Sequence, residues 1–115
     1  MVEIHEYRGE GYKPLVDYED WRVAILRYCD WFTGLKGLER HLETDEVFVL
    51  LEGEATLITD EADGIREWKM ERGKIYNVLK GVWHHIIVTP DASVLIVENR
   101  NTGADNTERK RLSEN

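Results

Sequence analysis

Short apolar runs alternate with turn-forming residues along most of the chain, and this pattern constrains the fold more than any other feature. Apolar residues recur with period two or in runs such as 47–51, 86–88 and 94–97. Turn residues separate the runs about every eight to twelve positions, a spacing typical of all-β proteins. The pattern predicts strands at residues 21–30, 37–42, 46–51, 54–59, 65–70, 74–78, 84–89 and 93–98. Eight short strands of this kind suit a barrel or jelly roll.

The chain of 115 residues is long enough for one domain, so we expect residues 1–115 to form a single unit. Residues 1–20 mix glycine, proline and charge, which predicts an arm or an edge strand. Residues 100–115 are mostly polar. We expect this tail to fray, with a short capped helix at 107–112 as the most that it could form.

The charge balance argues against an anionic partner. The formal net charge is −8, so the chain should repel nucleic acid and anionic membrane surfaces. The single cysteine, Cys29, cannot form an internal disulfide. The first residues lack a basic leader and an apolar signal region, and no apolar run is long enough for a membrane span. We therefore expect a protein of the reducing cytoplasm.

Two separate stretches carry groups that can bind metals. Glu39 and His41 share one face of an expected strand, because side chains alternate along a strand. A turn at 43–45 would bring Glu46 back beside them. His84 and His85 begin a later strand and must face opposite ways, so only one of them can join the same interior.

The spacing of these residues resembles the two motifs of the cupin family of small β-barrels. The first stretch reads Glu39-x-His41-x4-Glu46-x6-Gly53, with Glu39 where cupins usually have a histidine. The second reads Gly73-x5-Leu79-x-Gly81-x2-His84, with Leu79 in place of the usual proline and Val88 in place of the usual asparagine. The resemblance implies a double-stranded β-helix or jelly-roll barrel and a homodimer. It selects His84 over His85, which we expect to face outward or into an interface.

The resemblance also implies a ligand set of Glu39, His41, Glu46 and His84 for one divalent metal ion. Two imidazoles and two carboxylates suit Mn²⁺, Fe²⁺, Zn²⁺ or Ni²⁺. His41 and His84 with one carboxylate would also make the facial triad of non-haem iron oxygenases. Glu39 is the residue most suited to act as a catalytic base instead of a ligand.

The sequence is compatible with two functions. In the first, the barrel binds the metal and a small polar ligand, as in an enzyme acting on a sugar-type or hydroxy-acid substrate. In the second, the motif spacing persists without a metal, and the barrel is a non-catalytic module for ligand binding or dimerisation. Arg27, Phe48 and Tyr76 are candidate pocket residues, and Arg27 would suit an anionic ligand. Trp31 and Trp83 are candidates for the cavity or its mouth, although aromatics in small β-sandwiches mostly fill volume, which favours packing roles for all of them.

Overall fold

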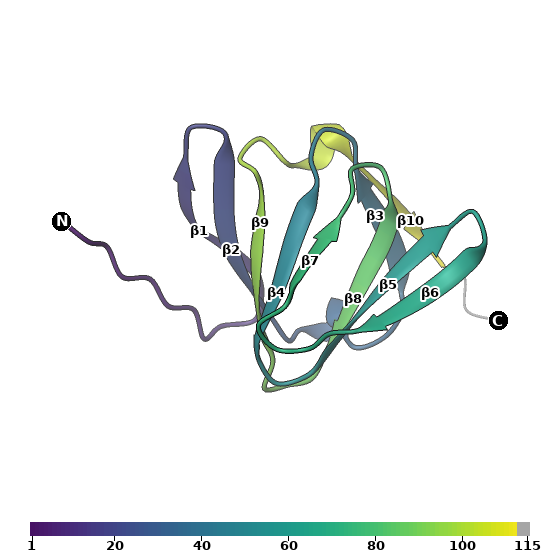
Figure 1. Ribbon diagram of the computed structural model, residues 1–115, viewed down its shortest axis with the longest axis horizontal. Helices are drawn as coiled ribbons and strands as arrows, with labels where there is room; N and C mark the ends of the chain where they lie inside the picture. Colours follow the sequence, from purple (N-terminus) through teal and green to yellow (C-terminus); the bar gives the residue numbers. More distant parts are fainter. Residues whose placement is uncertain (113–115) are drawn as a thin grey trace.

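The computed structural model describes residues 1–112 and folds them into two antiparallel five-stranded sheets that face each other (Figure 1). The first sheet has the order β1-β2-β9-β4-β7, and the second has the order β10-β3-β8-β5-β6. In both sheets, strands that are distant in the sequence lie next to each other. The all-β barrel class predicted from the apolar pattern is confirmed.

The strands of the first sheet are β1 (Gly11–Tyr18), β2 (Trp21–Arg27), β9 (Ser93–Asn99), β4 (Glu46–Glu52) and β7 (Ile75–Val78). Those of the second are β10 (Thr107–Arg111), β3 (Gly37–His41), β8 (Trp83–Val88), β5 (Ala55–Glu61) and β6 (Gly64–Lys69). Short 3₁₀ turns, η1 (Asp30–Phe32) and η2 (Ala104–Asn106), precede β3 and β10. All eight expected strands are present, with ends within a few residues of their predicted positions.

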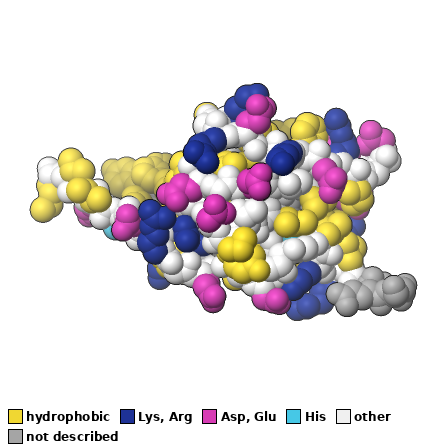
Figure 2. All heavy atoms as spheres, turned by 90° about the horizontal axis from the view of Figure 1, so that it is seen from below, with side chains coloured by type: hydrophobic (Ala, Val, Ile, Leu, Met, Phe, Trp, Pro, Cys, Tyr) yellow, Lys and Arg dark blue, Asp and Glu magenta, His cyan; other side chains and the backbone are white. Residues whose placement is uncertain are grey.

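The N-terminal segment divides into an extended part and an edge strand. Residues 1–10 contain no strand and project from the barrel (Figures 1 and 2). Strand β1 then pairs antiparallel with β2, with an irregular register between Pro14 and Val16. Proline lacks the N–H group that a sheet requires, so a bulge on an edge strand is a position that accommodates it.

Strand β10 differs from the expected fraying tail. Its residues pair one for one with β3, from Thr107 opposite His41 to Arg111 opposite Gly37. The segment carries almost no apolar residues, so its extended form depends on hydrogen bonds to the exposed edge of β3 and not on an apolar pattern. The part of the expected tail at 113–115 lies outside the described residues.

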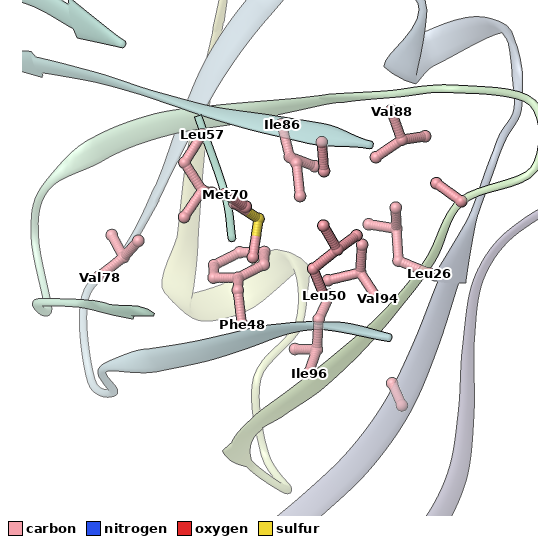
Figure 3. Close-up of a cluster of buried hydrophobic side chains, with 13 residues drawn as sticks. Leu26, Phe48, Leu50, Leu57, Met70, Val78, Ile86, Val88, Val94 and Ile96 are labelled. Carbon is pink, nitrogen blue, oxygen red and sulfur yellow. The ribbon is translucent and has the colours of Figure 1, made fainter. Parts of the chain in front are cut away.

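The hydrophobic core lies between the two sheets. Figure 3 shows side chains from both sheets meeting there, among them Phe48 of β4, Ile86 of β8 and Ile96 of β9. Phe48 is 2% exposed and Ile96 is 1% exposed. These residues alternate with half-buried neighbours, as period-two strands require. On the same strands, the inward-facing residues beyond this core are polar: Glu46 of β4, His84 of β8 and Glu98 of β9.

Surface charge is mixed on the face that Figure 2 shows, where acidic and basic side chains lie between single hydrophobic ones. Within residues 1–112, no helix has the length and apolar character needed to cross a membrane.

Candidate metal centre

A cavity of about 520 Å³ opens between the two sheets beside the hydrophobic core. Its apolar floor includes Phe48, Ile86 and Ile96. The cavity is lined by all four predicted ligand residues: Glu39, His41, Glu46 and His84. Both sheets contribute residues to this lining. A concave site with an apolar floor and a few converging polar groups has the usual character of a small-molecule site.

Local strand geometry brings these four side chains together. Glu39 and His41 lie two residues apart on β3 and share its inner face. His84 is the direct cross-strand partner of Glu39 on the neighbouring strand β8. Glu46 begins β4 on the opposite sheet, directly after the turn that follows His41. The expected reversal at 43–45 therefore carries Glu46 across from one sheet to the other.

Glu46 is the hydrogen-bond centre of the cluster. Its Oε1 lies 2.9 Å from Nε2 of His41 and 3.0 Å from Nε2 of His84. All three side chains are buried, with relative exposures of 6% for Glu46, 7% for His41 and 3% for His84. One carboxylate oxygen therefore faces two imidazole nitrogens in a region with little access to water.

The outer nitrogens of the two imidazoles have different partners. Nδ1 of His84 lies 3.0 Å from the backbone carbonyl of Val82. A carbonyl only accepts hydrogen bonds, so Nδ1 of His84 carries a proton. Nδ1 of His41 lies 2.9 Å from the hydroxyl of Thr107, which can donate or accept. The His41 ring can thus adopt either tautomer.

The fixed tautomer of His84 has a direct consequence for the centre. With Nδ1 protonated, a neutral His84 presents the lone pair of Nε2 to the carboxylate oxygen of Glu46. Two lone pairs at 3.0 Å repel each other unless a positive charge lies between them. The arrangement therefore requires either an extra proton on this pair or a metal ion, and it suits a metal because imidazole nitrogen and carboxylate oxygen are both good ligands for divalent ions.

Without a metal, protons take this role. Burial would raise the pKa of Glu46, but the hydrogen bonds from His41 and His84 outweigh it and lower that pKa from 4.5 to about 2. Burial likewise opposes protonation of His41 and His84, yet the hydrogen bond and charge of Glu46 raise the pKa of both imidazoles. The metal-free centre is thus an ionised carboxylate that favours protonated histidines.

Glu39 lies at the more open side of the cluster and has a partner of its own. Its Oε2 accepts hydrogen bonds from Arg109, at 2.8 Å from the terminal nitrogen and 3.3 Å from Nε. The Glu39 side chain is 27% exposed. One potential ligand atom from each of Glu39, His41 and His84 lies within 4.8 Å of the others. Glu39 can therefore reach the two histidines, but in this structure it forms an ion pair with Arg109.

Sequence reasoning missed a third carboxylate, Glu98 of β9. It lines the same cavity and forms a second group of potential ligand atoms with His41 and Glu46, again within 4.8 Å. Tyr12 and Arg22 donate hydrogen bonds to its Oε1. Burial, and then the charge of Glu46, raise the pKa of Glu98. Its position one residue after the apolar run 94–97 made it look like the end of a core strand, and only its polarity at an inward-facing position could have identified it.

Of the three candidate pocket residues, only Phe48 lines the cavity. Tyr76 packs against the core, and its hydroxyl accepts a hydrogen bond from the backbone N–H of Glu71. Arg27 follows the buried Leu26 on β2 and so faces the other side of the sheet. The arginine of β2 that does reach the cavity is Arg22, whose side chain lies on the same face as Leu26.

His85, which we expected to face outward or into an interface, is buried within the chain itself. It is 4% exposed, and its Nε2 lies 2.8 Å from the carbonyl oxygen of Gly34. Trp31 and Phe32 of η1 pack against its ring at centroid distances of 5.4 and 6.1 Å. The η1 turn thus covers a strand face that an uncovered sheet would expose. Trp31 also lines the cavity.

Trp83 faces away from the cavity and packs between two cations. The Arg40 guanidinium lies 4.7 Å from its ring centroid, and the Lys110 ammonium lies 4.5 Å from it. This contact joins β8 to β3 and to the polar strand β10, and cation–π contacts of this kind stabilise partly exposed positions.

Comparison with known proteins reveals similarity in structure and not in sequence. No protein-family sequence model and no curated protein sequence matches the chain. Among solved structures, a cupin-2 domain protein from Shewanella frigidimarina superimposes with a TM-score of 0.62 and 20% identity, over 82% of this chain and 85% of that one. Oxalate decarboxylase from Bacillus subtilis gives a TM-score of 0.67 and 15% identity, over 90% of this chain but 29% of that one.

A third neighbour is Pac13 from Streptomyces, a nucleoside dehydratase whose variant structure includes uridine. It superimposes with a TM-score of 0.68 at 6% identity, over 98% of this chain and 95% of Pac13. Identities this low establish a shared fold and leave the chemistry of each protein to its own site.

Proposed function

We propose that this protein, a small β-barrel with the cupin fold, binds one divalent metal ion and a small polar ligand in the cavity between its sheets. The candidate ligands are Glu39, His41, Glu46 and His84. The observation that carries the proposal is the convergence of both imidazole Nε2 atoms on one oxygen of Glu46, at 2.9 and 3.0 Å. A divalent cation at this point would be bound by two neutral imidazoles and by a carboxylate that neutralises part of its charge.

The donor set favours Mn²⁺, Fe²⁺, Zn²⁺ or Ni²⁺, since imidazole and carboxylate ligands suit these ions. Backbone and hydroxyl partners support the imidazole rings, because Val82 fixes the orientation of His84 and Thr107 contacts His41. Partners of this kind are a regular feature of metal sites, where they orient the ligands.

Within this proposal, the cavity best supports an enzyme that acts on sugar-type or hydroxy-acid substrates. A bound divalent ion would supply Lewis-acid polarisation of a substrate oxygen. Arg22 and Arg109 both line the cavity and can pair with a carboxylate of the substrate. Glu39 is partly open to solvent, and its Oε1, the oxygen outside the ion pair with Arg109, would accept a proton as a general base must. Among the structural neighbours, the name of one refers to oxalate, a dicarboxylate, and the structure of another includes uridine, which contains a sugar.

The alternative is a metal-free barrel that binds a ligand without catalysis. Its specific support is that the cluster has hydrogen-bond partners without any metal: Glu46 accepts from both histidines if His84 is protonated, and Arg109 neutralises Glu39. In this form the histidines would remain part of a structural hydrogen-bond network.

Thermal unfolding in the presence of metals separates the two functions. The protein is stripped with chelator and then titrated separately with Mn²⁺, Fe²⁺, Zn²⁺ and Ni²⁺. A ligand at a hundred times its dissociation constant stabilises the native state by about 2.7 kcal/mol. We expect at least one metal to raise the midpoint of thermal unfolding of the parent. The same metal should raise that of His5→Ala, a control in the projecting N-terminal segment. It should leave the midpoint of the His41→Ala, His84→Ala double variant unchanged. Equal shifts in all three proteins, or none in the parent, would refute the metal site.

Two further expectations accompany the proposal. The cupin resemblance implies a homodimer, and the lone cysteine favours a cytoplasmic protein. Sedimentation equilibrium at micromolar concentration tests the first: a mass of twice 13.5 kDa is expected, and a mass of one chain across the range would contradict it.

A further inference from the structure

Glu98 is a buried carboxylate with one oxygen that has no partner. Its side chain is 3% exposed. Tyr12 and Arg22 both donate to Oε1, whereas Oε2 is buried and makes no hydrogen bond within the described part of the chain. A buried polar atom without a partner costs about 1 to 3 kcal/mol, and more when it is charged. An oxygen in this state indicates that something else fills the place of the missing donor.

The surroundings of Glu98 indicate a cation. Strand β9 pairs antiparallel with β4, and Val47 lies opposite Val97. One position further along this register, Glu98 lies beside Glu46 on the inner face. Single ligand atoms of Glu98, Glu46 and His41 lie within 4.8 Å of one another. Two neighbouring carboxylates repel each other in a region of low dielectric constant, and a cation held between them turns this repulsion into attraction.

Glu39 has the opposite character. Its Oε2 already accepts hydrogen bonds from two nitrogens of Arg109, so its charge is neutralised without a metal. For Glu39 to bind a metal, this ion pair must be broken or shared. Glu98 has no such competitor at Oε2, because both of its donors contact the other oxygen.

We propose that Glu98 is a direct ligand of the metal ion, acting together with His41 and Glu46, and that Glu39 remains paired with Arg109 outside the coordination sphere. This inference rests on the proposed metal function and exchanges Glu39 for Glu98 in its ligand set. Tyr12 and Arg22 then serve as positioning residues, which hold Oε1 so that Oε2 is directed at the ion. Burial and the hydrogen bond to Glu98 raise the pKa of Tyr12, so its hydroxyl remains a donor at neutral pH.

The matched pair Glu98→Gln and Glu39→Gln tests the assignment, because each change removes one carboxylate charge and preserves the shape of the side chain. Isothermal titration calorimetry with Zn²⁺ at neutral pH gives the affinity of each variant. Loss of even an outer partner of a metal ligand weakens binding about 10- to 100-fold. We expect at least a tenfold loss for Glu98→Gln and less than about a threefold change for Glu39→Gln. The reverse order would overturn the inference.

Crystals of the parent protein with Zn²⁺ give a test that does not depend on whether a variant folds. Anomalous scattering at the zinc edge locates the ion, and a ligating oxygen lies about 2.0 to 2.2 Å from it. We expect Oε2 of Glu98 at this distance and Glu39 still bonded to Arg109. Zinc bound by the parent with Glu98 outside this distance would refute the inference alone. No binding of Zn²⁺, Mn²⁺, Fe²⁺ or Ni²⁺ by the parent in calorimetry would refute the proposed function and the inference together.

Discussion

Replacing Glu46 by glutamine should remove a pH-dependent contribution to stability from the metal-free protein. The pKa of Glu46 is lowered from 4.5 to about 2, against burial, by the hydrogen bonds from His41 and His84. Each unit of pKa corresponds to about 1.4 kcal/mol, so ionised Glu46 contributes about 3 kcal/mol to the free energy of unfolding. Glutamine has nearly the same shape but cannot ionise, so the variant lacks this contribution.

The stabilisation from this cluster is lost both at low pH and at high pH, for different reasons. For a carboxyl with a lowered pKa, the stabilisation is complete above 4.5 and is lost as the pH falls towards 2. The pKa values of His41 and His84 are raised above 6.5, against burial, by the hydrogen bond and charge of Glu46. Their stabilisation is therefore complete below 6.5 and is lost as the pH rises through their values in the folded state. The difference between parent and variant should be greatest between about pH 4.5 and 6.5.

Urea unfolding in chelator, followed by tryptophan fluorescence from pH 2.5 to 9, measures this difference. We expect the variant to be about 3 kcal/mol less stable than the parent near pH 6, with a smaller difference at both ends of the range. Glu52→Gln is the control, since the Glu52 side chain is 52% exposed, and it should change stability by less than about 0.5 kcal/mol. A difference between parent and Glu46→Gln that stays constant with pH would refute the description of the centre.

Two further predictions concern the scaffold, and urea unfolding measures both. Gly53→Ala should destabilise the protein by more than about 1 kcal/mol, because Gly53 has a φ of +72° and an added Cβ would lie 2.6 Å from Cα of Ala92; Gly34→Ala meets no atom within 4 Å and should cost far less. Equal costs would contradict the requirement for glycine at position 53. Phe48→Ala should cost about 3 to 5 kcal/mol because Phe48 is 2% exposed, whereas Ile75→Ala, at a position 73% exposed, should be nearly neutral; a similar loss for both would mean that Phe48 is not a core residue.

Much of the fold follows from the sequence because apolar alternation reports directly on strands that face a core. The eight strands expected from this pattern are present, and the cupin fold implied by the two motifs is confirmed by the solved structures. Strand β10 was missed because its residues, such as Arg109 and Arg111, carry no apolar pattern. Its extended form comes from pairing with β3, an interaction that no local property of the segment encodes.

The site was harder to predict than the fold, because it depends on which strands become neighbours. His41 and Glu46 are close in the sequence, so the motif spacing indicates their proximity. Glu98 meets Glu46 only because β9 pairs with β4, and that pairing is a property of the topology. Arg27 was predicted to lie in the pocket, where the structure has Arg22, for a similar reason. The inward face of β2 can be assigned only when Leu26 is known to be buried.

Elemental analysis of the purified protein tests the metal centre most directly. The protein is prepared without chelator and without a metal-binding tag, next to the His41→Ala, His84→Ala double variant. The proposal predicts close to one equivalent of a divalent transition metal in the parent and none in the variant. No metal in either protein, even after incubation with Mn²⁺, Fe²⁺, Ni²⁺ and Zn²⁺, would contradict a metal centre and leave the metal-free barrel as the function to pursue.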